Sequence, residues 1–202
     1  AATNTRAIYA GVAGLTINAS GGGNISIVAT QAATLATNPG AISFGGSSDI
    51  LASTGNISID GGAKGIYWTG TINLGALAAS TAATGSVTVT GDSLNGSPTV
   101  AVKTTGAVVF ESSSTSFGAT FSTTSLSLSG PPSSLRIGKS TNTSGVTISG
   151  GTTTVAGPVT IYGAAVTASS AITATTTNGD VMIPATGAVS VTAAITASGN
   201  IG

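Results

Sequence analysis

A five-residue unit recurs along this chain: Gly, a small or polar residue, and then an apolar, a polar and an apolar residue. Apolar–polar alternation with a period of two predicts a strand that buries one face. The leading Gly supplies backbone freedom for a bend, and Asn at the next position tolerates the same left-handed geometry. Each unit therefore predicts a short strand with its own corner. The units are Gly23-Asn-Ile-Ser-Ile27, Gly40-Ala-Ile-Ser-Phe44, Gly55-Asn-Ile-Ser-Ile59, Gly70-Thr-Ile-Asn-Leu74, Gly85-Ser-Val-Thr-Val89, Gly106-Ala-Val-Val-Phe110, Gly157-Pro-Val-Thr-Ile161, Gly179-Asp-Val-Met-Ile183 and Gly187-Ala-Val-Ser-Val191.

The spacing of these units predicts coils built from several strands. The leading glycines at 40, 55, 70 and 85 follow one another in 15-residue steps, and elsewhere the steps include 17, 21, 12 and 8 residues. Weaker apolar positions such as Leu35, Ile50 and Leu77 fall between the full units. We therefore expect a strand about every eight residues and three strands in a coil of roughly 20–25 residues, the size of a β-solenoid repeat. The chain would form about eight to ten coils, stacked roughly 4.8 Å apart.

The apolar positions of the units predict a ladder of stacked side chains inside the solenoid. One coil alone cannot bury its interior face, so we expect stability to accumulate from coil to coil. The predicted ladder consists of Ile25, Ile27, Ile42, Phe44, Ile57, Ile59, Ile72, Leu74, Val87, Val89, Val108, Phe110, Val159, Ile161, Val181, Ile183, Val189 and Val191.

Composition favours an all-β chain organised as one domain over residues 1–202. Hydrophobic residues make up 41% of the chain and charged residues only 5%. Ala, Val, Ile, Thr, Ser and Gly dominate, and small or β-branched side chains suit closely stacked strands better than helices. An irregular region about 111–144 interrupts the rhythm, with Phe117 and Phe121 in a Ser/Thr-rich stretch and then Pro131-Pro132 in a loop around one strand. We expect no domain boundary there, because the pattern resumes at Gly145.

The few ionisable residues exclude several classes of function. The net charge is zero, which argues against a nucleic-acid partner or an anionic membrane surface. Cys and His are absent, so disulfides, zinc sites and Cys–His or Ser–His–Asp catalysis are excluded. The chain contains no run of 18 apolar residues, so the sequence predicts no membrane-spanning helix.

The acidic residues are too sparse and scattered to predict catalysis or metal binding. The five are Asp49, Asp60, Asp92, Glu111 and Asp180. Polysaccharide-cleaving β-helices need clustered carboxylates, so we expect this protein not to be an enzyme and to need no cofactor. Calcium-binding β-rolls carry Gly-Gly-x-Gly-x-Asp in series. Here Asp60 precedes its glycines without a second aligned copy, which predicts an Asp–Gly turn.

The sequence offers two weak candidates for surface binding. Tyr67 and Trp68 are the only adjacent aromatics, and such side chains are frequent at interfaces and as sugar-stacking platforms. Alternation along a strand places one of the two inward. The Thr-rich stretches suggest ice binding as an alternative function. Ice binding needs Thr-x-Thr in regular rows on one face of the solenoid. The outward positions Ser58, Asn73, Thr88, Val109 and Met182 form no such row.

The Gly-Asn-Ile-Ser-Ile and Gly-Asp-Val-Met-Ile units, the Ser/Thr/Ala/Gly background and the absence of Cys resemble the filamentous-haemagglutinin-like exoproteins and autotransporter passengers of Gram-negative bacteria. The resemblance spans most of the chain. It implies a right-handed parallel β-helix, export to the bacterial cell surface, and a role in attachment, aggregation or a surface fibre.

These observations lead to a structural or adhesive solenoid as the expected function. The chain would be a segment of a longer rod or a subunit of a filament. Its expected partners are further coils of the same polypeptide or other copies of itself, with host surfaces, abiotic surfaces or glycans as further partners. A carbohydrate-binding or carbohydrate-cleaving β-helix and an ice-binding solenoid are the alternatives.

Overall fold

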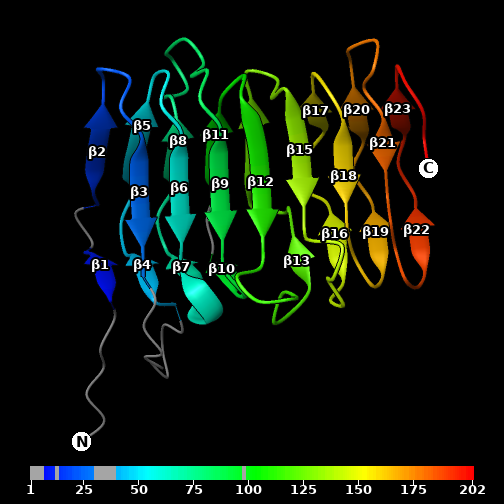
Figure 1. Cartoon of the computed structure of the whole chain (residues 1–202), viewed down its shortest axis with the longest axis horizontal. Coiled ribbons are helices and arrows are strands. Elements are labelled where there is room, and N and C mark those ends of the chain that lie inside the picture. Colours follow the sequence, from blue (N-terminus) through cyan, green and yellow to red (C-terminus); the bar gives the residue numbers. More distant parts are fainter. Residues whose placement is uncertain (1–6, 12–13, 30–39, 97–98) are drawn as a thin grey trace, which may run out of the picture.

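Apolar–polar alternation produces strands of two to five residues that wind into a parallel β-helix (Figure 1). The computed structural model describes residues 7–11, 14–29, 40–96 and 99–202. Seven coils contribute three strands each in this part of the chain, the last described coil contributes two strands and a bridge, and every strand pair is parallel. The single 3-10 helix of the described residues is η1 (Gly62–Lys64). The sequence colours of Figure 1 advance from one end of the rod to the other, coil by coil.

The strands form five sheets, named here by the place of their strands in a coil. The third-strand sheet contains β3 (Ile25–Val28), β6 (Ile57–Asp60), β9 (Val87–Thr90), β12 (Ala107–Glu111), β15 (Ser134–Ile137), β18 (Val159–Ile161) and β21 (Val181–Met182). The N-terminal first-strand sheet contains β1 (Ile8–Ala10), β4 (Ile42–Phe44), β7 (Ile66–Trp68) and β10 (Leu94–Gly96), and its C-terminal counterpart contains β13 (Phe121–Ser122), β16 (Val146–Ile148), β19 (Val166–Ala168) and β22 (Val189–Val191). The N-terminal second-strand sheet contains β2 (Thr16–Ala19), β5 (Ser48–Ala52), β8 (Ile72–Gly75), β11 (Val100–Lys103) and β14 (Leu126–Ser129), and its C-terminal counterpart contains β17 (Thr153–Val155), β20 (Ile172–Ala174) and β23 (Ile195–Ala197).

The register of the third-strand sheet gives the number and length of the coils. One inward rank runs through Ile25, Ile57, Val87, Val108, Leu135, Val159, Val181 and Ile201. The described residues therefore form eight coils, within the predicted eight to ten. Coil length varies from 20 residues (Val181 to Ile201) to 32 residues (Ile25 to Ile57). The 30-residue coil from Ile57 to Val87 is longer than expected because it carries a loop over residues 76–82. Ile50 lies on β5 as expected, Leu77 lies in a loop and not on a strand, and Leu35 is outside the described residues.

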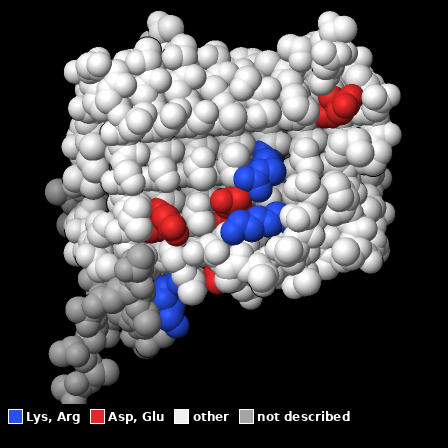
Figure 2. All heavy atoms as spheres, in the orientation of Figure 1, with Lys and Arg blue, Asp and Glu red and all other residues white. Residues whose placement is uncertain are grey.

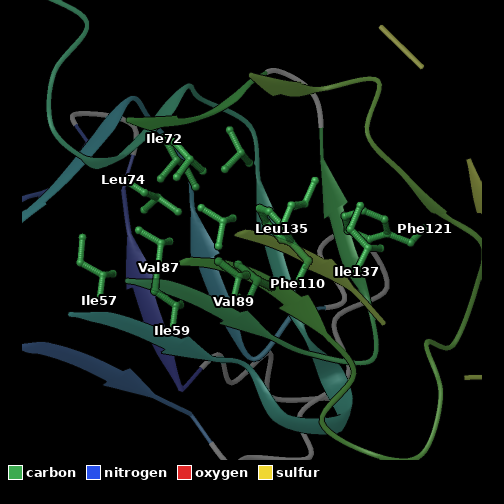
Figure 3. Close-up of a cluster of buried hydrophobic side chains, with 14 of the residues drawn as sticks. Ile57, Ile59, Ile72, Leu74, Val87, Val89, Phe110, Phe121, Leu135 and Ile137 are labelled. Atoms are coloured by element: carbon green, nitrogen blue, oxygen red, sulfur yellow. The ribbon is translucent and has the colours of Figure 1, made fainter. Parts of the chain in front are cut away.

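The interior of the rod is a column of stacked apolar side chains (Figure 3). Fifteen of the eighteen predicted ladder residues, from Ile25 to Val181, are buried. Ile183 is partly buried against the core. Val189 and Val191 are in register with buried Val166 and Ala168, yet they are 48% and 46% exposed. Their strand has a described neighbour on one side only, so half of each side chain remains uncovered.

Four leading glycines of the units, at positions 55, 85, 106 and 157, are required by space and not by backbone conformation. None of Gly55, Gly85, Gly106 and Gly157 has a positive φ, which corrects the expected left-handed bend. A Cβ at Gly85 would instead overlap the carbonyl oxygen of Gly55, and a Cβ at Gly55 would overlap that of Gly23. The backbones of successive coils approach so closely at this corner that only Gly fits.

The second position of the unit forms a hydrogen-bonded ladder at the same corner. The Asn56 backbone N–H donates to Asn24 Oδ1 at 2.8 Å, and the Ser86 N–H donates to Asn56 Oδ1 at 2.9 Å. The Asn200 N–H likewise donates to Asp180 Oδ1 at 2.6 Å. Asn and Asp therefore link one coil to the next. The structure describes no residue other than Gly with a positive φ, so left-handed geometry does not explain Asn here.

An aromatic cluster fills the rod where its first-strand row changes sheets. The N-terminal sheet ends at β10 and the C-terminal one begins at β13. The Phe110 and Phe121 ring centroids are 5.6 Å apart, and those of Phe117 and Phe121 are 5.2 Å apart and stacked. All three rings are buried. The irregular region 111–144 is thus built into the coil stack, with β13, β14 and β15 inside it.

Candidate functional site

Each carboxylate in the structure serves a local contact. Asp60 Oδ1 accepts the Gly62 N–H at 2.8 Å, which is the predicted Asp–Gly turn, and Asp92 Oδ1 accepts the Ser114 N–H at 2.7 Å. Asp49 accepts from Asn73 Nδ2 at 2.7 Å on the next coil. The described residues include no group of three or more acidic, His or Cys side chains that could hold a metal ion. Figure 2 shows a largely uncharged face, on which basic and acidic side chains adjoin near the centre and the few others lie apart.

One ion pair joins two coils on the third-strand sheet. The guanidinium of Arg136 and Glu111 Oε2 are 2.8 Å apart, and Arg136 also donates to the carbonyl oxygen of Gly138. The side chains are 39% and 20% exposed, so solvent screens the pair and limits its contribution to about 1 kcal/mol or less. The pair links neighbouring coils, and the guanidinium of Arg136 is occupied by Glu111 and the Gly138 carbonyl oxygen.

The two aromatic candidates separate onto opposite sides of β7. Trp68 is buried and belongs to the core, so its ring cannot stack on a sugar at the surface and this candidate is wrong. Trp68 follows Ile66 by two residues, so both side chains lie on the inward face of the strand. Tyr67 is half-buried and outward, in register with Ser43 and, through it, with exposed Tyr9.

A groove lies between the N-terminal second-strand sheet and the loop over residues 76–82. Its volume is about 520 Å³. The floor is an outward rank of that sheet, in which Asn18 pairs with Leu51 and Leu51 with Gly75. Leu77 and Ser80 line it from the loop. None of the described residues that line this groove is charged.

A second surface feature is a double rank of hydroxyl groups on the C-terminal first-strand sheet. The first rank is Ser122, Thr147, Thr167 and Ser190 in strand register, and the second rank, two residues further along each coil, is Thr124, Ser149, Ser169 and Thr192. All eight are exposed or half-buried. Thr124 Oγ1 and Ser149 Oγ are 2.6 Å apart, and Ser169 Oγ donates to the carbonyl oxygen of Ile148.

The final coil presents an apolar patch. Val189, Val191 and Ile201 are all at least 46% exposed. Val189 and Val191 lie on the inward face of their strand, because they pair with buried Val166 and Ala168. The patch is therefore an extension of the core and not a separate surface site.

Sequence reasoning missed both the groove and the hydroxyl ranks for one reason. Coil lengths vary, so the residues that share a face could not be aligned from spacing alone. A search for Ser/Thr-x-Ser/Thr that alternates with each buried pair would have found Thr147-Ile-Ser149 and Thr167-Ala-Ser169. Among the described residues, no helix is long and apolar enough to span a membrane.

Comparisons with protein-family models, curated proteins and solved structures found no match for this chain.

Proposed function

We propose that this protein is a structural and adhesive module of a bacterial cell-surface fibre, which lengthens by stacking coil on coil. The observation that carries the proposal is the inward apolar rank that runs in register from Ile25 to Ile201, so that each coil buries its interior face only against its neighbours. Val189 and Val191 continue the neighbouring part of this column. The family resemblance of the repeated units supports the surface location. The sparse charges and the local use of each carboxylate fit a structural role better than a catalytic one.

The physical reason for stacking is the combination of apolar side chains and open strand edges. The strands β22 and β23 each pair on one side only within the described residues. Unpaired N–H and C=O groups on an edge pair readily with another strand. A next coil, from the same polypeptide or from another copy, would cover the valines and complete the ladders. Head-to-tail contact between copies does not close on itself, so it produces a filament.

Assembly is tested by placing charge on the inward rank of the final coil. We expect the chain to form end-to-end rods longer than the roughly 40 Å of eight coils at about 4.8 Å each. The double substitution Val189→Glu/Val191→Glu should abolish these rods, because stacking would bury two unpaired charges. Negative-stain electron microscopy and sedimentation over a range of protein concentrations measure the outcome.

The matched control is Ser190→Glu, which adds a charge to the same strand on its exposed outward face. This variant should assemble like the unmodified chain. Circular dichroism checks that all variants keep their β structure. Rods formed equally well by the double variant, or an unmodified chain that stays single at every concentration, would contradict the proposal.

A second candidate function is binding to an ice surface, favoured by the double rank of hydroxyls. Successive coils repeat the hydroxyls about every 4.8 Å, and the two ranks lie about 6.6 Å apart along the strands. The hydroxyl groups of Thr147, Thr167 and Ser190 have no hydrogen-bond partner among the described residues, so they are available to ordered water. The eight positions carry no charge.

Thermal hysteresis measures this second function directly. We expect the chain to lower the freezing point below the melting point, and Thr167→Lys in the middle of the first rank to remove most of the effect. Thr173→Lys is the control, since Thr173 is an outward hydroxyl on the other C-terminal sheet. Absence of thermal hysteresis in the unmodified chain would exclude ice binding.

A further inference from the structure

The loop that forms the groove is held in place on the side away from the opening. Lys103 Nζ donates to the carbonyl oxygen of Ala78 at 2.5 Å, and the Ser80 N–H donates to Leu77 at 2.9 Å within the loop. Where the chain returns to the rod, Ala83 bridges to Thr104. These contacts hold the loop against the rod without a ligand, and a preformed site loses less entropy on binding.

Gly75 allows the loop to leave the rod at this point. It has a φ of +91°, and a Cβ there would lie 2.6 Å from the carbonyl oxygen of Lys103. The chain can therefore turn outward directly after β8 while the coil below stays close. The groove is a built feature of the third coil, formed over the outward residues of the first two.

The lining combines uncharged hydrogen-bonding groups with apolar side chains. Asn18, Ser53 and Ser80 line the groove, and their side chains have no hydrogen-bond partner among the described residues. Leu51 and Leu77 add apolar surface beside them. The ammonium of Lys103 is used by the loop and does not line the groove.

We infer that this groove binds a neutral saccharide. A sugar ring presents hydroxyls at its rim and C–H groups on its faces, which match the amide and hydroxyl groups and the two leucines. A charged ligand would lose its hydration on entering the groove, and no charged side chain among the described residues of the lining would compensate for that loss. The volume of about 520 Å³ lies within the roughly 300–1,000 Å³ of small-molecule sites. The inference rests on the proposed adhesive function, because a neutral saccharide is the class of ligand to which the fibre would attach.

An array of immobilised glycans tests the inference on the full chain. The probes are neutral oligosaccharides of glucose, galactose, mannose and N-acetylglucosamine, printed beside sulfated and sialylated forms. We expect retention on one or more neutral glycans. Calorimetry with the strongest-bound neutral oligosaccharide should then show affinity at least about tenfold weaker in Ser53→Trp, whose indole would fill the groove, and about threefold to tenfold weaker in Asn18→Ala.

The matched control is Ser127→Trp, which places the same ring on an exposed outward position of β14, two coils beyond the groove. Its affinity should be unchanged. Retention of sulfated or sialylated glycans alone, no retention of any glycan, or full affinity in Ser53→Trp would each overturn the inference. Rod assembly is measured separately by microscopy, so loss of sugar binding with intact rods leaves the structural role standing.

Discussion

Replacing Gly85 with Ala is expected to lower the free energy of unfolding by about 3 kcal/mol, because the new methyl group would overlap the backbone of the preceding coil. Neither backbone can move away without breaking the ladder between β6 and β9. For a chain of this size, the melting temperature should fall by roughly 6–12 °C. Thermal and urea unfolding followed by circular dichroism measure both quantities.

Gly23→Ala is the control for this prediction. Gly23 leads the same sequence unit, but a Cβ there would meet no described atom within 4 Å. The change in stability should stay within about 0.5 kcal/mol. An equal loss at both positions would mean that the unit needs the conformational freedom of Gly, and the argument from close backbone approach would fail.

Replacing Phe110 with Ala should cost about 3–5 kcal/mol, the usual range for deleting a buried ring. Phe110 lies in register between Val89 and Ile137 and is only 2% exposed. Its ring also contacts that of Phe121 where the first-strand row changes sheets. The neighbouring Phe121 ring is stacked on Phe117, so it would not fill all of the space and part of the cavity would persist.

Two comparisons test whether the Phe110 effect comes from packing. Val109→Ala on the outward face of the same strand should cost less than about 1 kcal/mol, since Val109 is already half-exposed. Phe110→Leu should recover about half of the loss by refilling part of the volume. Hydrogen exchange should show the largest loss of protection in β12 and β13. A uniform loss along the rod would argue against a local cavity.

The short-range features of this fold could be predicted from the sequence. Alternation around Ile57 and Ile59, or Val87 and Val89, identifies a strand and its buried face within five residues. The same logic explains why Trp68, two residues after Ile66, is inside. Parallel stacking follows because a Gly-led strand that repeats without helices can bury its face only against copies of itself.

The features that depend on alignment between coils could not be predicted. Which outward residues become neighbours depends on coil length, and a coil of 32 residues cannot be distinguished from one of 20 by the local pattern. The groove requires Asn18, Leu51 and Gly75 to meet across three coils. The role of Gly85 also depends on this alignment, because its neighbour Gly55 on the preceding coil is 30 residues away in the sequence.

The ladders between coils run along the axis of the rod, and they determine how a fibre built from this fold would carry force. A pull on the two ends loads the hydrogen bonds between successive coils in series, so the weakest junction limits the strength of the whole. Most junctions have three ladders. The junction between β10–β12 and β13–β15 has two, because β10 and β13 do not pair, and the next junction lacks a pairing between β14 and β17. The phenylalanine cluster lies at the first of these junctions, where it supplies cohesion that the backbone does not.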